Sequence, residues 1–177
     1  MVRVGNPVST IFVAPSVTPW RARLSESTRS MAHNPGIRKV FFDDDQGYVD
    51  NIEQFFLNLP KANQDQAAQW LRLYTFKGLY AGVNNLTSRA LHQLIESFKE
   101  YGDNDFHIYY DQFSVGARHI SNEPCSCMCK FTHICSMQSV NYTDFDACIK
   151  HIACDGNRVS VSTTISIFSL VCYKLMF

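Results

Sequence analysis

The sequence predicts an α+β fold in which strands come first, helices follow, and a cysteine-rich segment comes last. Three observations support this order. Apolar residues near the N-terminus occur in short β-prone runs, and from about residue 63 they recur with helical spacing. Six of the seven cysteines then lie between Cys125 and Cys154. With 177 residues, 46% of them hydrophobic, the chain has enough apolar material for a packed core.

The charge balance argues against a nucleic-acid partner. Lys+Arg and Asp+Glu number 16 each, and the basic residues form no dense block. Proteins that bind nucleic acid or anionic membranes through phosphate neutralisation need such a block. The longest apolar stretch is also shorter than the ~20 residues that a membrane-spanning helix requires.

Three short runs are predicted to be strands. Residues 8–14 are β-prone and end at Pro15, 37–42 follow the turn Asn34-Pro35-Gly36, and 51–59 end at Pro60. Residues 21–33 are polar without a sustained period and are predicted to form a loop. Three strands make too small a sheet to bury both faces, so the N-terminal third is predicted to be the end of a larger sheet.

Three helices are predicted between the strands and the cysteines. The first spans about 63–78, the second follows the N-cap Thr87 and stops by Gly102, and the third lies between Asp103 and Gly116. The side chains that define their apolar faces are Ala67, Trp70, Leu71 and Tyr74; Leu91, Leu94, Ile95 and Phe98; and Phe106, Tyr109, Tyr110 and Phe113.

The clustered cysteines are interpreted either as a disulfide knot in an oxidising compartment or as a metal site in a reducing one. Two glycosylation sequons, at Asn85 and Asn141, favour the oxidising compartment. The N-terminal segment 1–7 has no apolar signal region, so the sequence predicts a secretory interior without a signal peptide in this chain.

Few residues indicate catalytic chemistry. The sequence contains no Gly-x-Ser-x-Gly elbow and no phosphate-binding glycine loop. The acidic run 43–45 could bind a cation, but such a loop is usually solvated. A zinc site with the tight C-x-C-x3-H-x-C spacing remains an alternative to the disulfides; its ligands would be Cys127, Cys129, His133 and Cys135.

Several segments together resemble the C-terminal region of the acid sphingomyelinases. The first are Asn6-Pro7-Val8 and the run 12–18, followed by Asn34-Pro35-Gly36. The next are 58–63, the stretch 70–74, and Glu123-Pro124-Cys125 with the cysteines that follow it. The resemblance covers residues 5–152 in order. Three features depart from the family pattern, namely an insertion of about ten residues in 21–33, the extra Cys127, and the tail after Cys154.

The resemblance implies a metallophosphoesterase of the calcineurin-like type that hydrolyses sphingomyelin to ceramide and phosphocholine with two zinc ions. It implies that the metal ligands and the proton donor lie outside this chain, so no catalytic or metal-binding residue is assigned here. It also implies a secreted or lysosomal glycoprotein. Two disulfides carry over from the resemblance, Cys125 with Cys129 and Cys135 with Cys148. The resemblance assigns no partner to the extra Cys127; if this thiol pairs at all, the expected partner is Cys154.

We therefore expect three parts. Residues 1–62 would be the last strands of a metallophosphoesterase sheet, 63–152 a disulfide-stapled helical C-terminal domain, and 153–177 a tail of unknown role without a partner in that domain. The expected partners are the remainder of the metallophosphoesterase domain and, through the complete enzyme, a lipid surface. The chain alone is predicted to be inactive. The alternatives are a non-catalytic secreted interaction module and a truncated gene product.

Overall fold

The structure, a computed structural model, describes residues 7–22, 31–80, 82–100, 104–117, 125–155, 158–161 and 172–176. It divides into two compact units. The first unit combines residues 1–13, 87–106 and 124–175, and the second combines 14–86, 107–123 and 176–177. Both units are therefore assembled from segments distant in sequence. The predicted boundary between residues 62 and 63 falls inside the second unit.

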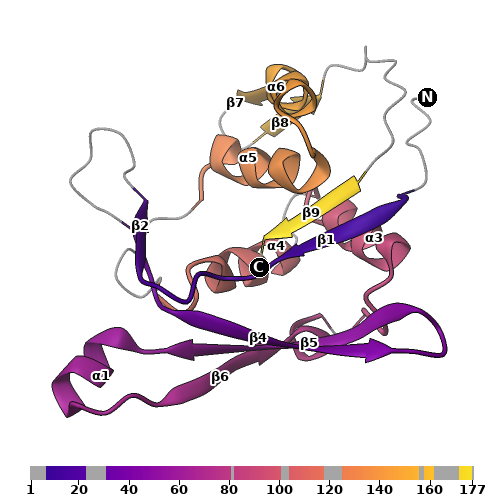
Figure 1. The fold of residues 1–177 in the computed structure, drawn as a ribbon. Coiled ribbons are helices and arrows are strands. Elements are labelled where there is room, and N and C mark those ends of the chain that lie inside the picture. The colour runs from indigo at the N-terminus through magenta and orange to yellow at the C-terminus, as the bar shows by residue number, and fades with distance from the viewer. Residues whose placement is uncertain are drawn as a thin grey trace. The chain divides into compact units, whose positions relative to one another are not determined.

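The second unit is built on a three-stranded antiparallel sheet in the order β4-β5-β6 (Figure 1). These strands are β4 (Gly36–Asp43), β5 (Tyr48–Leu57) and β6 (Trp70–Thr75), and the short helix α1 (Leu59–Asp65) leads from β5 towards β6. A separate hairpin pairs β2 (Trp20–Ala22) with β3 (Met31–His33). Helix α2 (Phe76–Leu79) and most of α4 (Asn104–Phe113) complete the unit.

A buried glutamine links two strands of this sheet. Gln54 is 1% exposed. Its Oε1 atom accepts hydrogen bonds from Nε and Nη2 of Arg38 at 3.0 and 2.9 Å, and its Nε2 donates to the carbonyl oxygens of Ile37 and Phe55 at 2.9 and 2.8 Å. Burial raises the pKa of Tyr74, the partner of Gln54 on β6, to about 12, with Arg38 opposing the shift. The side-chain amide thus uses both its donor and its acceptor groups inside the sheet.

An asparagine at the predicted turn connects the distant segments of this unit. Asn34 Nδ2 donates to the carbonyl oxygen of Val115 at 3.1 Å, and its Oδ1 accepts from the backbone N–H of Leu59 at 3.4 Å. The neighbouring Gly36 has no room for a side chain, because an added Cβ would lie 2.7 Å from Pro15 Cγ. The buried apolar side chains of the unit are Ile52, Tyr74, Phe76, Tyr80, Leu86, Tyr109, Val115 and Ala117.

The predicted helix over 63–78 is wrong. Residues 63–65 are the end of α1 and residues 76–78 lie in the short helix α2, but the stretch between them is not helical. The C-cap of α1, Gln66, has a left-handed φ of 52°. Residues 70–75 instead pair with β5, with Leu57 opposite Trp70 and Gln54 opposite Tyr74. The helical spacing of apolar residues was misleading because Trp70 and Leu71 are each 43% exposed and cover no core. Pairing with a distant strand determined the local structure here.

The first unit consists mainly of helices. It contains α3 (Ser88–Ser97), the first turn of α4, α5 (Cys127–Gln138) and α6 (Tyr142–Lys150). Strand β7 (Ile152–Asp155) pairs with β8 (Arg158–Val161), and β1 (Ser9–Val13) pairs with β9 (Cys172–Met176) (Figure 1). The predicted strand over 8–14 is thus confirmed.

The core of the first unit is formed by side chains of α3, the first turn of α4 and α5. Phe98 and Phe106 meet edge-to-face with ring centroids 5.9 Å apart, and the Lys130 ammonium lies 5.3 Å from the Phe106 ring centroid. Thr87 caps α3 as predicted, since its side chain accepts a hydrogen bond from the Ala90 N–H. The buried apolar residues of the unit are Leu91, Leu94, Ile95, Phe98, Phe106, Phe131, Ile134, Cys135 and Met137.

The other predicted elements have mixed outcomes. The strands over 37–42 and 51–59 and the second and third helices are confirmed. The predicted loop 21–33 is wrong at both ends, where β2 and β3 pair, and its middle, 23–30, lies outside the described residues, as do Gly102 and Asp103. Helices α5 and α6 were not predicted. The tail was expected to lack a partner, yet Arg158–Val161 and Cys172–Met176 each form a strand with one. Membership of a metallophosphoesterase sheet stays a prediction.

Replacing Gln54 by leucine should destabilise the chain by about 2–4 kcal/mol. The leucine would leave the Arg38 guanidinium and two carbonyl oxygens without their amide partner inside the sheet. Glu53→Gln is the matched control on the same strand, because its ion pair with Arg72 at 3.3 Å is solvent-exposed and worth less than about 1 kcal/mol. Urea unfolding measures both, and equal losses would contradict this role for Gln54.

Candidate functional site

Helix α5 carries most of the cysteine chemistry of the chain. Ser126 caps the helix and its Oγ accepts from the Cys129 N–H at 3.2 Å. Cys125, immediately before the cap, forms a disulfide with Cys129. Cys135, in the third turn of the helix, forms another with Cys148 of α6. These are the same two pairs that the resemblance implies.

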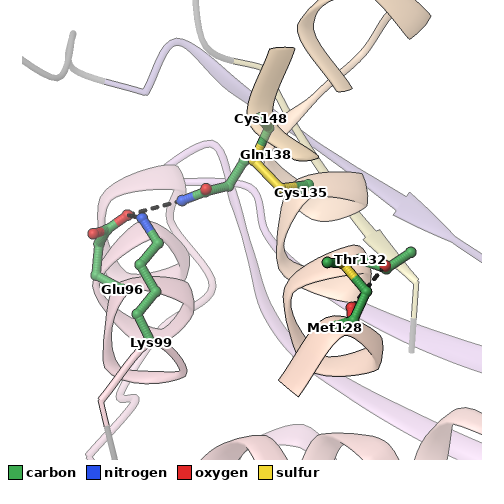
Figure 2. The surroundings of a disulfide bond; sticks show 7 residues. All are labelled: Glu96, Lys99, Met128, Thr132, Cys135, Gln138 and Cys148. Carbon is green, nitrogen blue, oxygen red and sulfur yellow. Dashed lines mark hydrogen bonds and ion pairs between the residues drawn. A yellow bond between two sulfur atoms is a disulfide. The ribbon is translucent and has the colours of Figure 1, made fainter. Parts of the chain in front are cut away.

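The Cys135–Cys148 disulfide lies beside a polar link between helices (Figure 2). One turn along α5, Gln138 Nε2 donates to Glu96 Oε1 of α3 at 2.8 Å, and Lys99 Nζ contacts the same oxygen at 2.6 Å. Cys135 is 0% exposed, so the disulfide is anchored in the core at one end. Covalent and polar contacts together attach α5 to α6 and to α3.

The third disulfide joins Cys127 of α5 to Cys154 of β7. Cys154 is therefore the mate of the extra cysteine, and the zinc alternative with Cys127, Cys129, His133 and Cys135 is wrong in this oxidised structure. Thiolates are the sulfur ligands of zinc, and all three of those sulfurs are in disulfides.

A different group of potential ligands does come together. The Sγ atoms of Cys125 and Cys129 and a ring nitrogen of His133 all lie within 4.8 Å of one another. In the part of the chain that the structure describes, this is the one group of three or more His, Cys, Asp or Glu ligand atoms at such distances. The sequence signal for it is the spacing of four between successive members, which places them along one face of a helix.

His133 is a partly buried imidazole within this group. Burial lowers its pKa to about 4, and its ring lies 6.3 Å from the ring of Phe106. The imidazole is therefore neutral at physiological pH. Burial also lowers the pKa of His33 in the second unit, where its ring contacts Phe113 edge-on at 5.5 Å.

The remaining candidates for metal chemistry do not converge. Asp43 Oδ1 accepts from the Gln46 N–H at 2.9 Å and so stabilises the turn after β4. The triplet Asp105-Phe106-His107 has an Asp-x-His spacing but lies inside α4, where residues two apart point in different directions. The donor sets of the described residues therefore do not fit a two-zinc phosphoesterase centre, and no catalytic step is assigned to them.

Both sequons lie at helix starts. Thr87 of the first sequon uses its hydroxyl oxygen as the cap of α3. Asn141 of the second caps α6, accepting from the Asp144 N–H at 2.9 Å and donating from Nδ2 to Asp144 Oδ2 at 2.8 Å. Asn141 is exposed, whereas Asn85 is half-buried beside the buried Leu86. Glycosylation of either asparagine stays a prediction.

None of the described helices has the length and apolar character needed to cross a membrane. The described residues thus form a helical unit with three disulfides and a second unit with an open three-stranded sheet. The Cys-Cys-His cluster is their one group of closely spaced potential metal ligands.

Residues 6–155 match the family described as the acid sphingomyelin phosphodiesterase C-terminal region. The chain is 32% identical over 146 residues to the cyclic GMP-AMP phosphodiesterase SMPDL3A of Rattus norvegicus, covering 82% of this chain and 31% of that protein. Identity is 28% to the acid sphingomyelinase-like phosphodiesterase 3b of Mus musculus, and 27% to sphingomyelin phosphodiesterase B of Dictyostelium discoideum; these alignments cover 82% and 80% of this chain and 30% and 20% of those proteins. The chain thus spans a third or less of the length of these relatives.

Removing a disulfide should destabilise the chain more when the loop that it closes is longer. Replacing Cys135 and Cys148 by serine should cost about 3 kcal/mol, with a further loss from the buried hydroxyl, whereas replacing Cys125 and Cys129 should cost about 2 kcal/mol. Denaturant unfolding of the two double variants tests this order. A larger loss for the Cys125/Cys129 variant would contradict it.

Stability should fall as the pH drops from about 6.5 to about 4, because the unfolded chain protonates His133 before the folded chain does. At 1.36 kcal/mol per pKa unit, the loss is of the order of 2–3 kcal/mol. His133→Gln should flatten this part of the profile. Unfolding free energies measured in urea across that range provide the test, and identical profiles for the two proteins would disprove it.

Proposed function

Because this chain belongs to the family of acid sphingomyelin phosphodiesterase C-terminal regions, we propose that it is the C-terminal structural portion of a phosphodiesterase. On this proposal the helical unit and the sheet support a catalytic metallophosphoesterase portion supplied outside this chain. Two zinc ions would be held in that portion, since the donor sets described above do not fit them. The chain alone would not hydrolyse phosphodiesters.

The observation that carries the proposal is the open sheet of the second unit. Both of its edge strands, β4 and β6, expose large apolar side chains. Val40 and Phe42 are 50% and 57% exposed, and Trp70 and Leu71 are 43% exposed each. Exposed apolar edge strands are aggregation hazards unless other protein covers them. The relatives contain two thirds or more of sequence beyond the matched region, which is the natural source of such a cover.

The shared reaction is phosphodiester hydrolysis, and its substrate is set elsewhere. Relatives named for cyclic GMP-AMP and for sphingomyelin match the same region of this chain at 32% and 27% identity. A region common to enzymes named for such different substrates supports the catalytic portion without choosing between them. If the substrate is sphingomyelin, the products are ceramide and phosphocholine, and the complete enzyme would work at a lipid surface.

The disulfides and sequons support the expected location. Three disulfides persist only in an oxidising environment, which fits a secreted or lysosomal glycoprotein. The same features would suit a non-catalytic secreted interaction module, so the test must separate the two functions.

A chimera provides that test. Residues 6–155 replace the matching region of the rat cyclic GMP-AMP phosphodiesterase, and zinc-dependent hydrolysis of cyclic GMP-AMP is measured beside the chain alone. We expect the chimera to be active and the chain alone to be inactive on cyclic GMP-AMP, on sphingomyelin and on a chromogenic phosphodiester. Turnover by the chain alone would overturn the proposal.

Charged substitutions identify the covered surface. Val40→Asp with Phe42→Asp should lower the melting temperature and the activity of the chimera, because the carboxylates would be buried against the catalytic portion. Val140→Asp is the control, since Val140 is similarly exposed, at 56%, but lies between α5 and α6. If both variants left the chimera unchanged, the stand-alone module would be favoured instead.

A further inference from the structure

We propose that reduction of the Cys125–Cys129 disulfide creates a zinc site whose ligands are the two released thiolates and the imidazole of His133. The inference is independent of the proposed phosphodiesterase role, because it concerns residues of the first unit alone.

The geometry of α5 brings the three ligands together. Cys125 precedes the N-cap, and Cys129 and His133 follow at intervals of four residues on the helix. Their ligand atoms already lie within 4.8 Å of one another. Around a tetrahedral zinc ion with Zn–S bonds of about 2.3 Å and Zn–N bonds of about 2.0 Å, ligand atoms are roughly 3.3–3.8 Å apart. Breaking the S–S bond lets the sulfurs separate to that spacing, and the imidazole needs a shift of only about 1 Å.

The Cys125–Cys129 disulfide should also be the easiest of the three to open. It closes a loop with a sequence separation of 4, against 27 for Cys127–Cys154 and 13 for Cys135–Cys148, so its loss costs the least chain entropy. Both of its cysteines are half-buried, whereas Cys135 is fully buried.

Its position in the helix favours the reduced form. Cys129 lies in the first turn of α5, where its own N–H is bonded to the Ser126 cap. The helix N-terminus stabilises thiolates and lowers their pKa, and a stabilised thiolate makes a disulfide more readily reducible.

The chemistry balances with a thiol reductant as the co-reactant. Two reductant thiols lose two hydrogen atoms and become a disulfide, and the Cys125–Cys129 bond gains them to give two protein thiols. Binding of Zn²⁺ then displaces the two thiol protons to solvent and forms two Zn–S bonds and one Zn–N bond. Three protein ligands leave the fourth position of the zinc ion open to water.

Zinc is the metal that this donor set favours. Two thiolates and one imidazole are the soft and borderline ligands of zinc sites, and none of the three groups is the carboxylate or carbonyl that calcium and magnesium require.

The experiment uses the full chain with Cys172→Ser, which removes the seventh cysteine. The chain is reduced in steps with a phosphine, which takes an oxygen atom from water while the opened disulfide gains the two hydrogen atoms. Differential alkylation with mass spectrometry identifies which disulfide opens. Zinc is added at neutral pH, excess metal is removed, and bound zinc is measured. We expect Cys125–Cys129 to open first and about one zinc ion to remain per chain, with none on the oxidised chain. Cobalt in place of zinc should give thiolate-to-metal charge-transfer absorption.

Two histidine variants provide matched controls, since both keep all six cysteines of the three disulfides and are reduced in the same way. His133→Gln should lower the affinity of the reduced chain for zinc by roughly tenfold or more, because it removes a ligand. His151→Gln, at the end of α6, should leave the affinity unchanged. The proposal is overturned if another disulfide opens first, if the reduced chain retains no zinc, if the oxidised chain retains as much, or if the two histidine variants bind zinc equally.

Discussion

The first unit depends on helix α5, because each of the three disulfides that the structure describes has at least one cysteine on that helix. One disulfide fixes its first turn, one joins it to α6 and one joins it to β7. The helix also contributes Phe131, Ile134 and Met137 to the buried core. The disulfides and the apolar packing of the unit thus depend on the same twelve-residue helix. A substitution that unfolds α5 would therefore destabilise the whole unit.

In its described part, the second unit is stabilised by hydrogen bonds within its sheet and not by disulfides. Its sheet contains no disulfide among the residues described, and its strands are joined through the Gln54 amide and the Arg38 guanidinium in addition to the backbone ladder. A satisfied polar network specifies one register, because a slip of one residue would leave Gln54 on the other face without Arg38. This network therefore selects a single strand register. The exposed edge strands leave apolar surface available for contact with other protein.

The sequence predicted the elements whose local pattern agrees with their tertiary environment. Helix α3 carries a capping Thr87 and a continuous buried stripe through Leu91 and Ile95, so period and packing coincide. Strand β6 shows the opposite case. Its apolar residues have helical spacing, but Trp70 and Leu71 are exposed while Tyr74 is buried, and only the partner strand explains its conformation. Helix α5 was missed because cysteines, a threonine and a histidine interrupt its apolar pattern, and their spacing was interpreted as covalent chemistry alone.

Several polar side chains of the chain have structural roles in this fold. Thr87 and Asn141 cap helices, Asp43 stabilises a turn, and His33 packs against Phe113. The Cys125–Cys129–His133 cluster differs because its sulfurs are linked by a bond that reduction can break. Its chemistry is therefore conditional on the redox environment, whereas that of the capping residues is fixed by the fold.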